Sequence, residues 1–320
     1  MPTQPDPLSP QAQAILDAPD QPRLTGELTI ERAQAIRESQ AQARRPVVDR
    51  VAAELGVTAA WHTVGGVKVV RVEAAEDKRR AFRGSDGPDG GDAKAAPQAL
   101  FLHGGGFTGG LAHDMSSVLN ADALGIPVWS VDYSLAPEAV FPTAVDEVES
   151  AYRVLTQQFP GLWVVFGVSA GGNLALALTQ RLLAAGDPVP AALGLYSPWT
   201  DLTGAGDSRT GNDGRDPVLR WPEQLPVAVD AYAAGAPLDD PLVSPIFATF
   251  DGFPPTLITT GTRDLFLSDC TRLHWALRRA EVPVELRVWE NLWHAFNTQH
   301  AVPEAAEARA EMAGFLLRHV

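Results

Sequence analysis

The sequence predicts an α/β protein with a mostly parallel central sheet that helices cover on both faces. Short apolar runs without polar alternation recur from residue 99 onward, as expected for strands that are buried on both faces. Helical stretches separate these runs, and strands that alternate with helices form a parallel sheet through right-handed crossovers. The hydrophobic content of 45% over 320 residues suffices for a large core, which excludes a disulfide scaffold or a largely disordered chain.

The elements follow from these patterns in chain order. Two strand-like runs flank Gly65-Gly66 and favour a hairpin, because its turn needs positive φ. The apolar runs predict strands at 99–103, 127–133, 162–168, 191–197 and 256–261, and the segment VELRVWE at 284–290 is interpreted as one further strand. Helices are predicted at about 142–158, 171–185, 268–281 and 303–319.

Three segments interrupt this alternation. Residues 1–50 are interpreted as a Pro-punctuated helical arm that needs a surface to lie on. Residues 199–245 are too long for an ordinary loop and have helical character near 222–234. We interpret them as a lid inserted into a sheet domain whose two parts are 51–198 and 246–320. The stretch 76–98 is rich in Gly, Asp and charged residues and is predicted to be a long exposed loop.

Charge and cysteine usage exclude several classes of function. The chain has 25 Lys and Arg against 39 Asp and Glu, a net charge of −14, which argues against a nucleic-acid or anionic-membrane partner. The single cysteine, Cys270, cannot form an intrachain disulfide or a multi-Cys zinc site. No apolar stretch reaches membrane-spanning length, and the first residues lack a basic and an apolar signal region. We therefore expect a soluble, cytoplasmic protein.

A nucleophile motif stands between a predicted strand and a predicted helix. Residues 167–171 read Gly-Val-Ser-Ala-Gly, which matches G-x-S-x-G. A strand-to-helix turn holds such a serine in a strained, exposed conformation, and the N–H groups of the following helix face its oxygen. Ser169 is therefore a candidate nucleophile. The alternative is a Gly-rich turn in which the serine only caps the helix.

Residues 103–107, His-Gly-Gly-Gly-Phe, end the strand at 99–103. Consecutive glycines leave backbone N–H groups unshielded, so in a serine hydrolase Gly104 and Gly105 would join Ala170 as oxyanion donors. A phosphate-binding loop or a flexible turn is the alternative, although no lysine follows the glycines. His103 is interpreted as a structural anchor of this loop.

A base and an orienting carboxylate complete the candidate site. Among the seven histidines, His294 follows the last strand, and Asp264 follows the strand at 256–261. Asp269 is the rival acid, but its place at a helix start favours a capping role. The chain order Ser169, Asp264, His294 is that of the α/β-hydrolase triad.

With these residues the sequence resembles the hormone-sensitive-lipase-like branch of the α/β-hydrolases, the bacterial family IV esterases. The matching motifs are HGGGF, DYSLAPE, FPTAVDE, GVSAGGN, SPWTDLT, TRDLFLSD and WHAF, which cover about residues 98–300 in the family's order. The resemblance implies Ser169 as nucleophile, His294 as base and Asp264 as its orienter, and the oxyanion donors given above. It also implies a cap built from residues 1–50 and 199–245.

The chain departs from the family pattern at three positions. Val168 stands where the family usually has an acidic residue or threonine, Ser134 where it has arginine, and Ala295 where it has glycine. None of these changes removes a catalytic group.

The expected activity is hydrolysis of small, neutral, short- to medium-chain acyl esters, without a metal or an organic cofactor. Four aromatic residues are candidates for lining the substrate pocket or for forming the core of the cap: Phe107, Trp199, Trp221 and Tyr232. An amide, carbamate or lactone hydrolase with the same triad, or a non-catalytic small-molecule receptor on this fold, remains open. The strand at 284–290 lies at a predicted sheet edge and could pair with a second copy of the chain.

Overall fold

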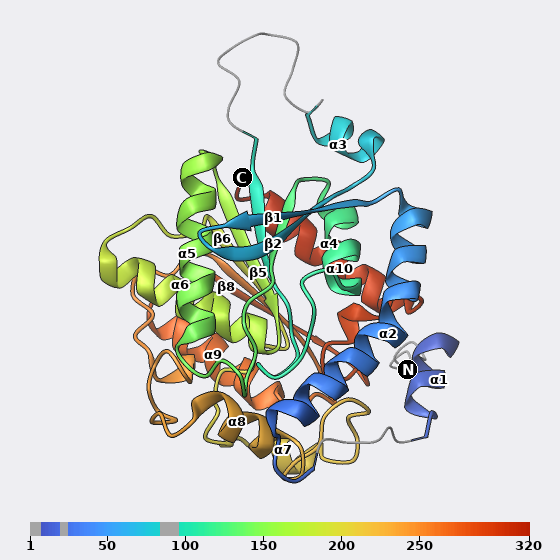
Figure 1. Cartoon of the computed structure of the whole chain (residues 1–320), viewed down its shortest axis with the longest axis vertical. Coiled ribbons are helices and arrows are strands. Elements are labelled where there is room, and N and C mark those ends of the chain that lie inside the picture. The colour runs from blue at the N-terminus through green and yellow to red at the C-terminus, as the bar shows by residue number, and fades with distance from the viewer. Residues whose placement is uncertain (1–7, 20–24, 84–95) are drawn as a thin grey trace, which may run out of the picture.

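A mostly parallel sheet of eight strands forms the centre of the computed structural model, which describes residues 8–19, 25–83 and 96–320 (Figure 1). The strands are β1 (Thr58–Val64), β2 (Val67–Glu73), β3 (Gln98–Leu102), β4 (Val128–Val131), β5 (Trp163–Val168), β6 (Ala192–Tyr196), β7 (Thr256–Gly261) and β8 (Val284–Trp289). Their order in the sheet is β1-β2-β4-β3-β5-β6-β7-β8. The pairs β1–β2 and β2–β4 are antiparallel and the others are parallel.

The predicted fold class is confirmed, and each predicted strand is present. The hairpin turns at Gly65 and Gly66, whose φ values are 58° and 82°. Both positions thus lie in the left-handed region that glycine adopts without a steric penalty.

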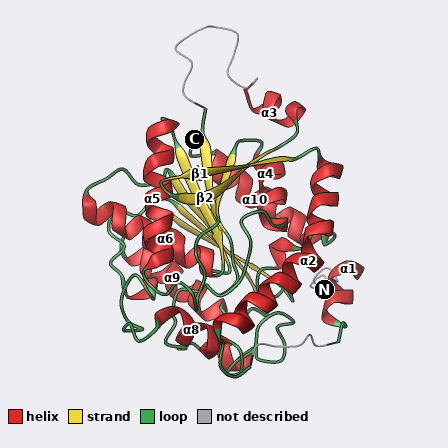
Figure 2. Cartoon of the chain, in the orientation of Figure 1, coloured by secondary structure: helices red, strands yellow, loops and turns green. Residues whose placement is uncertain are grey.

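Helices cover both faces of the sheet, which is seen between them in Figure 2. One face carries α5 (Thr143–Gln158), α6 (Ala170–Ala185) and α9 (Leu267–Arg279). The other carries α4 (Met115–Leu124) and α10 (Pro303–Leu317), with α2 (Ile30–Leu55) packed on α4. All of these except α4 were predicted, with ends that differ by a few residues.

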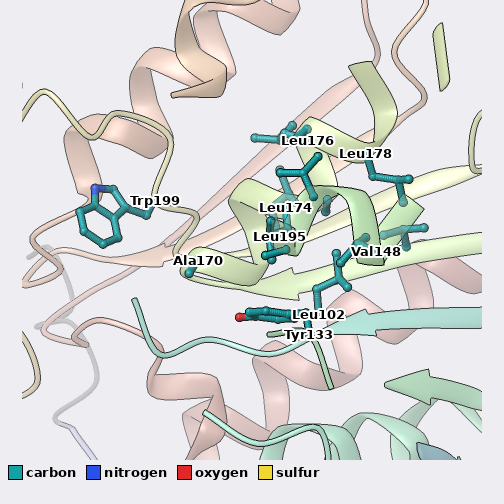
Figure 3. Packing of buried hydrophobic residues seen from close by; sticks show 14 of the residues in the cluster. Leu102, Tyr133, Val148, Ala170, Leu174, Leu176, Leu178, Leu195 and Trp199 are labelled. Carbon is teal, nitrogen blue, oxygen red and sulfur yellow. The ribbon is translucent and has the colours of Figure 1, made fainter. Parts of the chain in front are cut away.

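The two faces have separate cores because neighbouring residues of a strand point to opposite sides. On the α6 face, Leu102 of β3 and Leu195 of β6 pack with Leu174 of α6 and Val148 of α5 (Figure 3). Cys270 is fully buried in the same cluster, as expected for a small apolar residue.

Two helices make up most of the described part of the N-terminal arm. Besides α2 it contains α1 (Pro10–Leu16), which packs against the start of α10. Ser9 binds Glu304 twice, through its N–H at 2.7 Å and its hydroxyl at 2.8 Å. α2 continues beyond the predicted boundary at residue 50 and ends at Leu55, where Gly56 adopts a left-handed cap.

The prediction of a loop throughout 76–98 was wrong in part. Residues Glu76–Arg83 form α3, because two acidic residues in the first turn and strong helix formers outweigh the exposed, charged character of the segment. Gln98 is already part of β3. Residues 84–95 lie outside the described part of the chain.

The insertion between β6 and β7 contains α7 (Ser208–Gly211), α8 (Leu225–Ala233) and a 3₁₀ turn at Pro245–Phe247. α8 agrees with the helical character expected near 222–234. Among the described residues, no helix is long and apolar enough to cross a membrane.

The start of α6 makes a close approach to β3 that we expect to tolerate no side chain. A Cβ at Gly171 would overlap the carbonyl oxygen of Leu102, and neither backbone can move without disrupting the sheet. Gly171→Ala should therefore lower the free energy of unfolding by about 3 kcal/mol or more. Denaturant titration measures the change.

Gly211→Ala is the matched control, because no atom lies within 4 Å of a Cβ at that position. Its stability should stay within about 0.5 kcal/mol of the wild type. Equal stability of both variants would contradict the close approach at Gly171.

Candidate active site

Ser169 occupies a strained turn between β5 and α6. Its φ of 57° and ψ of −117° lie outside the regions that side chains other than glycine usually adopt. Backbone hydrogen bonds hold this conformation, because the Ser169 N–H donates to the Tyr196 carbonyl at 2.9 Å and its own carbonyl accepts from Trp199 N–H at 3.1 Å. The hydroxyl caps no helix N–H, which argues against the purely structural interpretation.

The glycine loop after β3 lies against this turn. A Cβ on Gly104 would stand only 3.4 Å from Ser169 Cβ, so the two backbones are in contact. Gly105 has a φ of 125° and packs on the carbonyl group of Gly109. Within the described chain, the N–H groups of Gly104, Gly105 and Ala170 donate to no backbone carbonyl or side chain. Two of these donors, on Gly104 and Ala170, thus lie on residues next to Ser169, and Gly105 follows Gly104 in the loop.

His103 anchors the loop and has no sign of a proton-transfer role. Its Nδ1 lies 2.8 Å from the Gly104 carbonyl, which can only accept, so Nδ1 carries the proton. The ring stacks on Tyr133 with centroids 4.1 Å apart. Burial lowers the pKa of His103 to about 4, so the ring stays neutral at physiological pH.

Asp264 and His294 are joined by a buried hydrogen bond of 3.0 Å between Asp264 Oδ1 and His294 Nδ1. Asp264 also accepts from the Thr260 hydroxyl at 2.8 Å and from Phe266 N–H at 2.8 Å. Because a carboxylate accepts, His294 carries its proton on Nδ1 and keeps the lone pair of Nε2 free to accept a second proton.

The three predicted residues lie at one edge of the sheet. Ser169 follows β5, and the turns that carry Asp264 and His294 follow β7 and β8. The carboxyl ends of these parallel strands meet at the same edge. Among the described residues, no hydrogen bond joins the Ser169 hydroxyl to His294, which leaves the pair Asp264–His294 as the contact that the structure itself contains.

The charge of each partner stabilises the charge of the other. Burial alone would raise the pKa of the Asp264 carboxyl, but the charge and hydrogen bond of His294, with donors from Ser197 and Phe266, hold that pKa below its ordinary value. Burial alone would lower the pKa of His294, but Asp264, and to a lesser extent Asp216, raise it above its ordinary value. The imidazole is therefore more basic than a free histidine.

Three of the four candidate pocket aromatics form a chain of ring contacts that Phe266 extends to His294. Phe107 lies face to face with Tyr232, with centroids 3.7 Å apart, and at 5.9 Å from Trp199. Trp199 stacks on Phe266, whose edge meets the His294 ring at 4.8 Å. Phe107, Trp199 and Tyr232 are almost fully buried, and the partly buried Trp221 packs against the same cluster.

Known proteins are similar to this chain in sequence. Residues 99–298 match a family profile described as the alpha/beta hydrolase fold. The chain is 33% identical to an acetyl-hydrolase of Streptomyces hygroscopicus, over 81% of this chain and 92% of that protein, and 35% identical to an esterase of Acinetobacter venetianus, over 69% and 75%.

Solved structures agree with these relatives. The crystal structure of an esterase named E25 has a TM-score of 0.85 at 30% identity and covers 99% of this chain and 97% of that chain. An esterase from the bacterial hormone-sensitive lipase family has a TM-score of 0.72 at 31% identity, over 82% and 84%. The chain belongs to the hormone-sensitive-lipase-like esterases of the α/β-hydrolase fold.

Two of the positions where this esterase departs from its family pattern have a visible structural role. Ser134 binds the side chain of Glu147 through its N–H at 2.6 Å and its hydroxyl at 2.7 Å. Ala295 adopts a φ of 53°, a left-handed conformation that glycine would adopt more easily. Its N–H donates to the Ser197 hydroxyl at 3.1 Å, which holds the turn after His294 in place.

Asp269, the rival acid, has another partner in this esterase. Its carboxylate accepts the N–H groups of Thr200 and Asp201 at 2.9 and 3.0 Å and pairs with the buried guanidinium of Arg209 at 3.0 Å. It caps no helix, so the capping interpretation was wrong. It instead holds the start of the insertion and α7 against α9.

Asp216, a fully buried residue of the insertion, was not predicted as a site residue. Its Oδ2 accepts the N–H of Leu265 at 3.2 Å and the N–H of His294 at 3.3 Å. The only local signal is an Asp-Pro pair in the segment GNDGRDP, whose composition is typical of a surface turn. Its contact with the turns that carry Asp264 and His294 depends on tertiary structure and cannot be derived from that pattern.

Proposed function

We propose that this esterase is a serine carboxylesterase that cleaves short- to medium-chain acyl esters through an acyl-enzyme on Ser169. The hydrogen bond between Asp264 and His294, at the sheet edge where Ser169 stands in its strained turn, carries the proposal. The relatives named acetyl-hydrolase and esterase support it from outside the chain.

In the proposed mechanism, His294 Nε2 takes the proton of the Ser169 hydroxyl while Oγ attacks the ester carbonyl carbon. The N–H groups of Gly104, Gly105 and Ala170 hold the resulting oxyanion, and each such donor contributes about 3 kcal/mol to transition-state stabilisation. The imidazolium then gives its proton to the leaving alcohol. A water molecule, deprotonated by His294, releases the carboxylic acid and restores Ser169.

We assign Asp264 two roles in this sequence of steps. It keeps the Nδ1 proton in place, and it stabilises the imidazolium that forms when His294 accepts the Ser169 proton. The absence of an Oγ–Nε2 hydrogen bond is compatible with this assignment, because such bonds often tighten only when substrate is bound.

We further propose that α1, α2 and residues 199–245 form a cap over the site. Phe107 of the glycine loop packs against Trp199 and Tyr232 of the insertion. These rigid rings limit the space that an acyl chain can occupy between the two segments, which supports a small acyl pocket. A net charge of −14 suits a neutral ester, which needs no electrostatic steering.

Ser169→Ala should reduce kcat for p-nitrophenyl acetate and butyrate by at least about 10⁴-fold, because no other group replaces the nucleophile. A fluorophosphonate probe should label the wild type and fail to label this variant. Ser150→Ala is the control, because Ser150 lies on α5 and binds the carbonyl of Gly65 in the hairpin turn. Undiminished turnover in Ser169→Ala would overturn the proposal.

Acyl length is the second test. Activity on p-nitrophenyl esters should be highest for short chains and fall sharply beyond about eight carbons, since each methylene that a closed pocket cannot accept costs about 1–3 kcal/mol. Steady-state kinetics over the series measures the profile. A profile that rises with chain length would contradict a small pocket, and equal turnover of a matched anilide would favour an amidase.

We also propose that two copies of the chain associate through β8. This strand lies at the edge of the sheet, where its backbone groups on one side have no partner strand among the described residues. Val288 on β8 and Trp275 on α9, which packs against β8, are 44% and 54% exposed. Exposed apolar side chains beside a free edge suit a symmetric interface.

Val288→Glu should convert this dimer to a monomer, because two-fold symmetry brings the new carboxylates of both copies to one interface. Light scattering at micromolar protein concentration should show the mass halved, with esterase activity retained. Val218→Glu is the control, since Val218 is equally exposed (41%) but lies in the insertion. A monomeric wild type would refute the interface.

A further inference from the structure

We infer that Asp216 is a positioning residue for the proposed catalytic pair, in which one carboxylate oxygen fixes the turns that carry Asp264 and His294 relative to each other. The inference rests on the proposed function, because it takes His294 as the base. It assigns a role in the reaction to a residue of the insertion that lies outside the triad and the oxyanion loop.

The carboxylate of Asp216 uses its two oxygens for different purposes. Oδ1 accepts the N–H groups of Val218 at 2.8 Å and Leu219 at 3.3 Å, which closes a turn around Pro217 and fixes the orientation of the side chain. Oδ2 is thereby directed away from its own segment. It accepts the N–H groups of Leu265 and His294.

These two N–H groups belong to the turns that carry Asp264 and His294, the two residues of the proposed proton transfer. Leu265 follows Asp264 directly, and the other donor is the backbone of His294 itself. A single oxygen atom therefore joins the β7 turn to the β8 turn at the proposed catalytic pair, at distances of 3.2 and 3.3 Å, in addition to the backbone bond from Arg263 N–H to the Leu292 carbonyl at 2.9 Å. The side-chain bond between Asp264 and His294 depends on that spacing, and a misplacement of about 1 Å at a reacting group can cost about 100-fold in rate.

The charge of Asp216 supports the same role as its hydrogen bonds, because it favours the protonated form of His294. The groups that face His294 are the carboxylates of Asp264 and Asp216 and the guanidinium of Arg209 on α7, whose own partner is Asp269 on α9. Asp216 raises the pKa of His294, whereas Arg209 lowers it. Burial and the neighbouring charge of Asp264 raise the pKa of Asp216 itself to about 6, so it is mostly ionised at neutral pH.

An amide cannot reproduce this arrangement. Its oxygen can take the place of either Oδ1 or Oδ2, and its NH₂ group then faces two N–H donors with no acceptor between them. Asp216→Asn therefore removes the negative charge and one of the two paired contacts while it preserves the volume of the side chain.

In Asp216→Asn, kcat/KM for p-nitrophenyl butyrate above neutral pH should fall about tenfold to 100-fold, mainly through kcat. The acidic limb of the pH profile of kcat/KM should move to lower pH, because a carboxylate that raises the pKa of His294 is lost. A residue that only stabilised the fold would change the unfolding temperature and leave this limb in place.

Asp240→Asn is the matched control. Asp240 also precedes a proline in the insertion, and its Oδ1 accepts the N–H of Leu242 at 2.8 Å in the same kind of turn. Its pH profile and kcat should equal those of the wild type. An active, folded Asp216→Asn enzyme with an unmoved acidic limb would overturn the inference.

If Asp216→Asn does not fold, the wild type decides the question. Two ionisations that both reduce activity should make the acidic limb of log kcat/KM steepen from a slope of one toward two below about pH 6, where Asp216 takes up its proton. A slope of one throughout would refute the inference. Failure of the proposed function has a different signature, namely no ester turnover or an active Ser169→Ala.

Discussion

The buried charge of Asp264 is the constraint on which the rest of the site depends. A carboxylate without solvent contact costs several kcal/mol unless hydrogen bonds and an opposite charge compensate for it. The compensation comes from His294, from Thr260 and Phe266 beside Asp264 in the chain, and from Ser197 after β6. The turns after β6, β7 and β8 are therefore held together by the requirement to keep one anion ionised.

The parallel sheet makes this concentration of groups possible. Neighbouring parallel strands have their carboxyl ends at the same edge of the sheet. Residues that follow different strands, and are far apart in sequence, therefore lie close together there. At this edge Ser169 adopts a strained backbone conformation with a φ of 57°. Its backbone hydrogen bonds to Tyr196 and Trp199 offset the cost of this strain. The residues that allow the strands and loops to approach are glycines, of which Gly171, Gly105 and Gly261 are the most confined: a Cβ there would lie 1.9, 2.1 and 2.1 Å from a backbone oxygen.

How far the sequence predicts the structure depends on what stabilises each element. The strands β3 to β7 were predicted because burial on both faces leaves a continuous apolar run. The edge strand β8 has no such run and is partly exposed along its length. α4 was missed because it is buried on nearly all sides, including Ser116, Ser117 and Asn120, so it lacks the polar face that reveals an amphipathic helix. Its only signal is the capping box of Asp114 and Ser117.

Some residues of the candidate site could likewise be predicted from the sequence, and one could not. Ser169, Asp264 and His294 follow from strand ends that periodicity locates. Asp216 does not, because its role depends on where a Gly- and Asp-rich segment returns to the sheet. Burial decides such cases: an aspartate in a turn is ordinarily hydrated, whereas this one is fully buried and binds backbone N–H groups of two other turns.

This coupling constrains how substrate specificity can change in the protein. The insertion supplies Trp199 and Tyr232 to the proposed pocket, and the same segment supplies Asp216 to the turns of Asp264 and His294. The buried ion pair of Arg209 and Asp269 fixes this segment to α9. Because hydrogen bonds and buried charges connect these parts, we expect a substitution that shifts the insertion to admit a larger acyl group to shift His294, the proposed base, as well. A change of pocket shape that leaves kcat intact must therefore come from side chains that point into the pocket while the backbone of the insertion stays in place.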